Sequence, residues 1–309
     1  MKNKSMTRRS VLKLAGYAGL GAATFPLSSL LNMDKAMLTR PIPSSGEALP
    51  VVGLGTWIQF DVGAAESERQ PLREVLQRMA DMGGKLIDSS PMYGESEQVV
   101  GDLTAATGLA DRFFYATKVW TSGRQAGIDQ MEASLRKMRR KTMDLMQVHN
   151  LVDWRTHLKT LQQWKDEGKI RYVGVTHYTV SAHEQLEQII KSHRIDFVQF
   201  NYSIRVRNAE RRLLDAARDR GVAVIINEPF EKGSLFSAVK GKTLPEWAAE
   251  YDINSWGQFF LKFILSHPAV NCVIPGTSNP KHAADNMGAG FGSLPDAKGR
   301  EKMAQVVGL

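Results

Sequence analysis

The sequence contains a single cysteine, Cys272, so no intramolecular disulfide can form and a disulfide scaffold is excluded. Its neighbours, in VNCVIP, predict a buried strand residue. Beyond the first forty residues there is no uncharged apolar run long enough to span a membrane, and the mean hydropathy is negative. Glycine and proline contents are ordinary and 43% of the residues are hydrophobic. Collagen-like, disordered and multi-span membrane proteins are therefore excluded, and a globular protein remains.

The body of the chain also lacks a strong excess of positive charge. Of the formal net charge of +8, residues 1–35 carry +5, which leaves about +3 for the rest. The densest basic run of the body, at 136–141, overlaps a pattern of apolar residues at helical spacing, formed by Met131, Leu135 and Met138. This pattern favours a solvated helix face, and we expect no nucleic-acid partner.

The first 35 residues have the layout of an export signal or an anchor tail. A basic start is followed by a mildly apolar stretch at 11–31, and Arg8 and Arg9 in TRRSVLK resemble the twin-arginine signal of bacteria. We therefore expect the twin-arginine export machinery as a partner and a periplasmic location. The alternatives are an uncleaved anchor at the inner membrane and a cytoplasmic form translated from Met33 or Met37.

From residue 49 onward, short apolar runs alternate with amphipathic stretches, which predicts strands and helices in alternation and a parallel sheet. Eight runs of this kind fit a single (β/α)8 TIM barrel over residues 36–309. The runs are VVGLGTW, KLIDSS, FFYATKVW, MDLMQVHN, IRYVGVTHY, DFVQFNYS, VAVIINEP and VNCVIPGT. Residues 38–50 predict a hairpin that caps the barrel floor.

The main competing fold is a doubly wound dinucleotide-binding domain, because Gly53 and Gly55 begin like a phosphate-binding turn. The third glycine of that motif is missing, and so is the acidic residue expected about 20 positions later. The barrel is therefore favoured.

Active groups of a barrel lie at the C-terminal ends of its strands, and polar residues end three consecutive runs. Asp88 ends KLID, Lys118 ends FFYATK and His149 ends MDLMQVH, while Tyr93 follows in SSPMYG. A nearby ammonium favours the phenolate and is expected to lower the pKa of the Tyr93 phenol toward neutrality. A carboxylate beside the lysine would hold the ammonium in place. The four residues thus predict a proton donor and the groups that tune it.

In its motifs the sequence resembles the aldo-keto reductase family from about residue 40 to its end. The matching segments are GLGTW at 53–57, IDSSPMYG at 87–94, TK at 117–118, VH at 148–149, GVTHY at 174–178, VQFNY at 198–202 and IPGTSNP at 274–280. The resemblance implies hydride transfer between a nicotinamide cofactor and the carbonyl of an aldehyde or ketone. It assigns Tyr93 as general acid, Lys118 and Asp88 as its tuning pair, and His149 as the group that orients the carbonyl.

The resemblance also implies a nicotinamide site. Thr176 and Gln199 match positions that bind the carboxamide, and His177 stands where an asparagine is common. Asn227 replaces a tyrosine that often stacks on the ring, which leaves Phe230 or Tyr202 as a substitute.

The last strand leads into a segment that matches the binding site for the adenosine half of the cofactor. Arginine and lysine positions of some relatives are occupied here by His282 and Gly276, which weakens the charge pairing with a 2′-phosphate. NADPH is expected, with NADH use left open. The implied contacts are Thr277, Ser278, Lys281, His282 and Asn286.

Trp57 and Trp120 follow strand ends and are candidate walls of a substrate pocket, as is the insertion at 232–245 with Trp247 and Trp256 beyond it.

Two other functions are alternatives to a reductase. A regulatory subunit that binds the nicotinamide without turnover, like relatives associated with potassium channels, keeps the same fold. A metal-dependent hydrolase is disfavoured, because the first strand has no His-x-His and too few ligands converge for a metal site.

Overall fold

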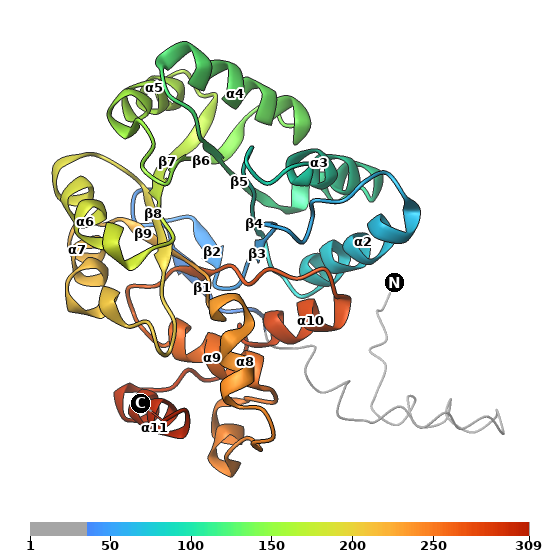
Figure 1. Ribbon diagram of the computed structural model, residues 1–309, viewed down its shortest axis with the longest axis vertical. Coiled ribbons are helices and arrows are strands. Elements are labelled where there is room, and N and C mark those ends of the chain that lie inside the picture. The colour runs from blue at the N-terminus through green and yellow to red at the C-terminus, as the bar shows by residue number, and fades with distance from the viewer. Residues whose placement is uncertain (1–35, 309) are drawn as a thin grey trace, which may run out of the picture. The chain divides into compact units, whose positions relative to one another are not determined.

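The computed structural model describes residues 36–308, and the predicted tail at 1–35 lies outside them. Eight parallel strands form one sheet in sequence order, with helices around it (Figure 1). The strands are β3 (Leu54–Gly55), β4 (Leu86–Asp88), β5 (Phe114–Val119), β6 (Met143–His149), β7 (Ile170–Thr176), β8 (Phe197–Asn201), β9 (Ala223–Asn227) and β10 (Cys272–Val273). Each strand lies within one of the apolar runs, as predicted.

The sheet curves until its first and last strands meet. Single parallel bridges join Val52 to Val273 and Gly55 to Gly276, and the Gly53 N–H donates to the Val273 carbonyl at 2.9 Å. These contacts close the sheet into a barrel, as predicted for a (β/α)8 fold, and the doubly wound alternative is wrong.

Amphipathic helices cover the outside of the barrel. In α5 (Trp154–Asp166) the buried residues Trp154, Leu158 and Leu161 recur at helical spacing and face the strands. The other α-helices are α2 (Glu66–Asp81), α3 (Ser96–Ala106), α4 (Arg124–Lys137), α6 (His183–Ser192), α7 (Leu213–Asp219), α8 (Ser234–Ala238), α9 (Trp256–Leu265), α10 (Pro280–Gly288) and α11 (Ala297–Val306). Short 3-10 helices are η2 (Ala110–Arg112), η3 (Val180–Ala182), η4 (Asn208–Arg211), η5 (Glu231–Gly233) and η6 (Glu246–Tyr251).

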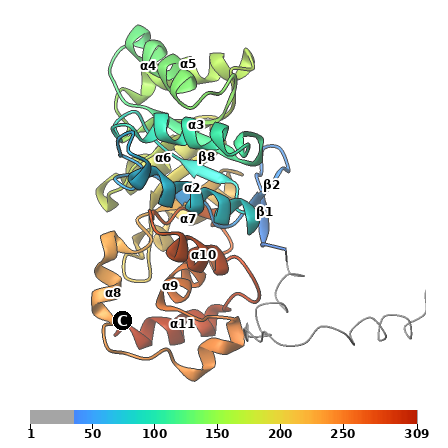
Figure 2. The same ribbon diagram turned by 90° about the vertical axis from the view of Figure 1, so that its right-hand side faces the viewer.

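A hairpin closes the N-terminal end of the barrel. Strands β1 (Thr39–Pro41) and β2 (Ala48–Pro50) pair antiparallel, and the fully buried Ile42 and Leu49 join the core residues at the strand starts, such as Phe114. Figure 2 shows this hairpin and α8 on opposite sides of the barrel. The predicted cap of the barrel floor is confirmed, and the opposite end is left for a site.

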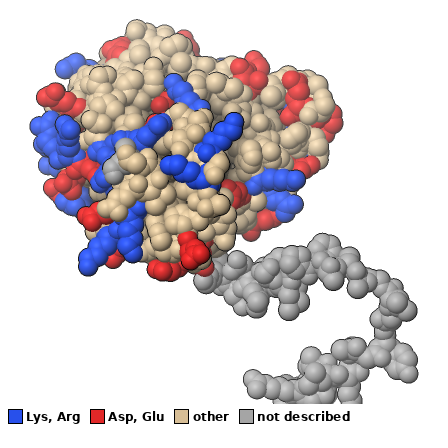
Figure 3. Space-filling view, turned by 60° about the horizontal axis from the view of Figure 1, so that its bottom comes forward, with Lys and Arg blue, Asp and Glu red and all other residues tan. Residues whose placement is uncertain are grey.

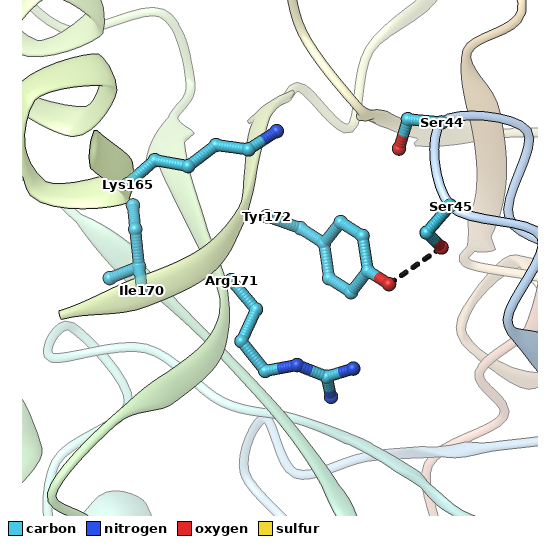
Figure 4. Close-up of a pocket in the computed structure, with 6 residues that line it drawn as sticks. All are labelled: Ser44, Ser45, Lys165, Ile170, Arg171 and Tyr172. Carbon is cyan, nitrogen blue, oxygen red and sulfur yellow. Dashed lines mark hydrogen bonds between the residues drawn. The ribbon is translucent and has the colours of Figure 1, made fainter. Parts of the chain in front are cut away.

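Beside this hairpin lies a hollow of about 380 Å³, in which the labelled side chains of Figure 4 gather. Its cations already have partners: Lys165 pairs with Asp196 at 2.7 Å and Arg171 with Asp144 at 2.7 Å. The Tyr172 hydroxyl lies 2.7 Å from that of Ser45. The contact between Ser45 and Tyr172 ties the hairpin to the barrel, and the two charged residues that line the hollow, Lys165 and Arg171, both have partners.

On the face shown in Figure 3, acidic and basic side chains are interspersed. Within residues 36–308, none of the helices combines the length and apolar character required to cross a bilayer.

Candidate active site

The four predicted chemical groups meet at the C-terminal end of the barrel. Asp88 is the last residue of β4, Lys118 lies in β5, and His149 is the last residue of β6. Asp88, Tyr93 and His149 line a cavity of about 700 Å³, and Lys118 is fully buried behind them. The strand order therefore brings these residues together as the sequence predicts.

Tyr93 is held in a tight turn that follows β4. Its N–H donates to the Ser90 carbonyl at 3.0 Å, and the next residue, Gly94, has φ of 57°. A Cβ at Gly94 would lie 2.2 Å from an oxygen of Asp61, whose carboxylate also accepts from the Glu95 N–H at 2.9 Å. Glycine is favoured at this left-handed position, because a side chain there would displace the Asp61 carboxylate from the turn that carries Tyr93.

Lys118 and Asp88 form a buried ion pair. The Lys118 Nζ donates at 2.6 Å to Asp88 Oδ2 and at 2.6 Å to the Ser89 carbonyl. Burial alone would lower the pKa of Lys118, but Asp88 and Tyr93 outweigh burial and raise this pKa above its usual value. The lysine is therefore held as an ammonium, with its Nζ 4.9 Å from the centre of the Tyr93 ring.

The pKa of Tyr93 differs from the sequence prediction. Burial raises it, and the opposing effect of Lys118 does not compensate, because Asp88 and Glu228 add to the increase. The predicted lowering is wrong as a net effect. The phenol is consequently protonated at neutral pH, which is the form that a proton donor requires.

His149 stands beside Tyr93 as a neutral imidazole. The two rings are 5.7 Å apart in a T-shaped arrangement, and Nδ1 of His149 lies 2.9 Å from the Ser90 hydroxyl. Burial, followed by Lys118 and His177, lowers the pKa of His149 to about 2. A neutral ring can both donate and accept one hydrogen bond.

The residues predicted to bind a carboxamide form a polar network with Asp88. Gln199 Nε2 donates to Asp88 Oδ1 at 2.9 Å, and Gln199 Oε1 accepts from Thr176 at 3.1 Å and from Asn227 at 3.3 Å. Thr176, Gln199 and Asn227 line the cavity. The half-buried His177 lies next to them in the chain, and its ring stacks on that of Tyr178.

The two aromatic substitutes for the stacking tyrosine are now distinguished. Phe230 lines the cavity. Tyr202 is fully buried, its hydroxyl lies 2.7 Å from the Arg300 guanidinium, and its ring packs near Phe263. Tyr202 is therefore unavailable for stacking, and Phe230 is the remaining candidate.

The segment predicted for the adenosine half continues from the cavity. Gly276 lines the cavity, and α10 begins four residues later with Asn279 as its N-cap, whose side chain accepts from the Lys281 N–H at 2.9 Å. Ser278, Lys281 and His282 are exposed, whereas Thr277 and Asn286 are buried. The exposed residues lie where a ligand extending from the cavity along this loop would pass.

The rim of the cavity is largely aromatic, and the Lys232 Nζ lies 5.7 Å from the centre of the Trp57 ring and 5.8 Å from that of Tyr178. Trp57, Tyr178 and Phe236 line it and are 47%, 46% and 41% exposed. Trp120, the other predicted wall, lies outside this lining, with its ring 6.5 Å from that of His149. Among residues 36–308, every large hydrophobic side chain that is exposed follows the C-terminal end of a strand: Trp57, Ile58, Met92, Trp120, Tyr178, Val180 and Phe236.

Sequence reasoning missed Gln147. It donates to Asp88 Oδ1 at 3.1 Å, and its position two residues before His149, on the same face of β6, is a signal that could have identified it. Of the wall predicted at 232–245, Phe236 lines the cavity, whereas Trp256 beyond it packs on Phe259 with ring centres 5.1 Å apart. Apolar composition alone does not distinguish such aromatic residues.

A model of the aldo/keto reductase family matches residues 51–299. The chain belongs to the aldo/keto reductase family. This aldo/keto reductase is 29% identical over 259 residues to methylglyoxal reductase YeaE of Escherichia coli (strain K12), a match that covers 81% of this chain and 89% of the relative.

Solved structures share the fold of this aldo/keto reductase. The holo form of aldo-keto reductase AKR11C1 from Bacillus halodurans has a TM-score of 0.71 at 21% identity, over 88% of this chain and 96% of that one. An aldo-keto reductase of Klebsiella pneumoniae in complex with NADPH has a TM-score of 0.71 at 22% identity, over 89% and 96%. Within the described part of the chain, no three His, Cys, Asp or Glu side chains are grouped to hold a metal ion.

Proposed function

We propose that this aldo/keto reductase reduces an aldehyde or ketone to an alcohol with NADPH, and that Tyr93 is the general acid. The observation that carries the proposal is the meeting of a protonated phenol, a buried ammonium and a neutral imidazole at one cavity. Family membership supports the same chemistry.

The residues around the cavity fit a nicotinamide dinucleotide. Thr176, Gln199 and Asn227 present hydroxyl and amide groups of the kind that bind a carboxamide, and Phe230 offers an apolar ring. The exposed Lys281 and His282 in the first turn of α10 lie where backbone N–H groups favour an anion such as a phosphate. When bound, the reduced nicotinamide supplies the hydride.

The protein's own residues handle the carbonyl oxygen. Tyr93 donates its hydroxyl proton to this oxygen, and Lys118 stabilises the phenolate that remains. Asp88, with three hydrogen-bond donors in Lys118, Gln147 and Gln199, keeps the ammonium in place. His149 orients the carbonyl from the neighbouring strand.

The aromatic residues of the rim favour a carbonyl compound with a large apolar body, because burial of that body against Trp57, Tyr178 and Phe236 contributes binding energy. Methylglyoxal, the substrate in the name of the E. coli relative, is small by comparison. Benzaldehyde and methylglyoxal are therefore the two substrates to compare, and we expect the larger kcat/KM for benzaldehyde.

The proposal is tested by the rate of NADPH oxidation with benzaldehyde for wild type, Tyr93→Phe and Tyr115→Phe. Loss of a general acid is expected to lower kcat by roughly 100-fold or more in Tyr93→Phe. NADPH affinity, measured by fluorescence titration, should change little. The matched control Tyr115→Phe removes a hydroxyl bonded to the Ala110 carbonyl, away from the cavity, and should retain activity.

Equal turnover in Tyr93→Phe and wild type would refute the role of Tyr93. Tight NADPH binding by the wild-type protein without turnover of any aldehyde would instead indicate a nicotinamide-binding regulatory subunit.

We also propose that residues 1–35, which lie outside the described residues, direct export to the periplasm through the twin-arginine machinery. The support is the sequence TRRSVLK at 7–13 and the apolar stretch behind it. Fractionation of cells should find the wild-type protein in the periplasm and the Arg8→Lys/Arg9→Lys variant retained inside. Wild-type protein confined to the cytoplasm would contradict the proposal.

A further inference from the structure

Ser90 lies two residues beyond Asp88 and is fully buried. Its Oγ is 2.9 Å from Nδ1 of His149 and accepts a hydrogen bond from the Met92 N–H at 3.3 Å. The side chain therefore closes its own turn and at the same time contacts the catalytic imidazole.

Counting donors and acceptors shows which atom carries the hydrogen between Ser90 Oγ and His149 Nδ1. The Met92 N–H occupies one of the two lone pairs of Oγ, and the hydroxyl hydrogen of Ser90 needs an acceptor of its own because the side chain is buried. Within residues 36–308, His149 Nδ1 is the only acceptor in contact with this hydroxyl. If Nδ1 carried a proton instead, a buried hydroxyl hydrogen would have no acceptor, which is unfavourable.

We propose that Ser90 donates its hydroxyl hydrogen to Nδ1 of His149 and thereby holds the imidazole in the tautomer whose proton is on Nε2. His149 lines the cavity, and Nε2 has no partner in the described part of the protein. The single ring proton is thus directed to the side where a substrate oxygen would bind.

The electrostatic environment supports this arrangement. Burial and Lys118 keep His149 neutral at neutral pH, so the ring has only one proton to place. Without a partner at Nδ1, a neutral imidazole exchanges between two tautomers, and only the one protonated on Nε2 can donate to a substrate oxygen. Ser90 is a positioning residue, and its catalytic effect rests on the proposed function of His149.

The tautomer is tested directly on the full chain, with and without NADPH, by two-bond ¹H–¹⁵N correlation spectra of protein labelled at its seven histidines. A His149→Gln variant identifies the signals of His149. We expect the pattern of a neutral ring protonated on Nε2 in the wild-type protein. A ring protonated on Nδ1 overturns the proposal, whatever the activity of the protein.

Steady-state kinetics test whether the hydrogen bond from Ser90 affects turnover. We expect Ser90→Ala to lower kcat with benzaldehyde by roughly 2- to 10-fold, the effect of one lost hydrogen bond, with little change in the KM for NADPH. Its spectra should show both tautomers, and Ser90→Thr, which keeps a hydroxyl, should recover the wild-type tautomer. Ser134→Ala, an equally buried serine on α4, is the matched control and should leave kcat unchanged.

The outcomes separate this inference from the proposed function. If His149 is protonated on Nε2 but the protein has no reductase activity, the proposed function is refuted and the assignment of Ser90 is not. An unchanged tautomer and unchanged kcat in Ser90→Ala would overturn the positioning role in an active enzyme.

Discussion

The neutral state of His149 predicts how the stability of the protein depends on pH. In the folded protein the pKa of His149 is lowered from 6.5 to about 2, mainly by burial. Because the folded pKa lies below the unfolded value, the contribution of His149 is fully present above pH 6.5 and is lost as the pH falls. Each pH unit lowers the ratio of folded to unfolded protein about tenfold, which amounts to about 3 kcal/mol between pH 6.5 and about pH 4.5.

The perturbation is His149→Gln, which removes the titrating group and keeps a polar side chain. Urea unfolding of wild type and variant should be followed by circular dichroism at several pH values between about 7.5 and 4.5. The other titrating groups are common to both proteins, so the difference between their free energies of unfolding isolates His149. We expect this difference to shift against the wild type by about 3 kcal/mol over that range. A difference that stays constant with pH would refute a neutral, buried His149.

Further predictions concern the turn, the ion pair and the rim. Asp88→Asn should lower the free energy of unfolding by about 3 kcal/mol or more, because it leaves the buried ammonium of Lys118 without its carboxylate; adding Lys118→Met should recover part of that loss. A loss below about 1 kcal/mol in urea unfolding would contradict a stabilising Lys118–Asp88 ion pair. Gly94→Ala should cost about 1 kcal/mol or more and reduce kcat, because its Cβ would meet Asp61, and kinetics equal to wild type would argue against a fixed Tyr93 turn. Phe236→Ala should raise the KM for benzaldehyde about fivefold and leave that for methylglyoxal unchanged, since only the larger substrate reaches the rim; equal shifts for both would disprove the rim's selectivity.

The barrel and its catalytic end could be predicted because both depend on local pattern. Each strand lies within a short, mostly apolar run, and strand ends are marked by polar residues such as Asp88 and His149. The parallel order of the strands then places those ends side by side without further information.

The net pKa of Tyr93 could not be predicted in this way. The sequence shows the ammonium that lowers the pKa, but not how deeply the loops after other strands bury the phenol or that Glu228 lies near it. Burial is a property of the assembled loops, and here it has the larger effect.

The residues that wall the cavity are a second feature that the sequence pattern could not fully predict. Phe236 and Trp256 both lie in the long connection between β9 and β10, and both are aromatic. Phe236 reaches the cavity from the short helix α8, whereas Trp256 starts α9 and packs against its own helix. This choice depends on the path of the connection, which periodicity does not specify.

The most direct test of the account follows the hydride itself. The full chain is incubated with benzaldehyde and NADPH deuterated at both C4 positions of the nicotinamide, and the benzyl alcohol is analysed by mass spectrometry. We predict that deuterium appears on the carbinol carbon as NADPH is consumed, and that Tyr93→Phe lowers the rate of this transfer by roughly 100-fold or more. Alcohol formed without deuterium, or no alcohol from any aldehyde despite bound NADPH, would contradict reduction of a carbonyl by hydride transfer at this site.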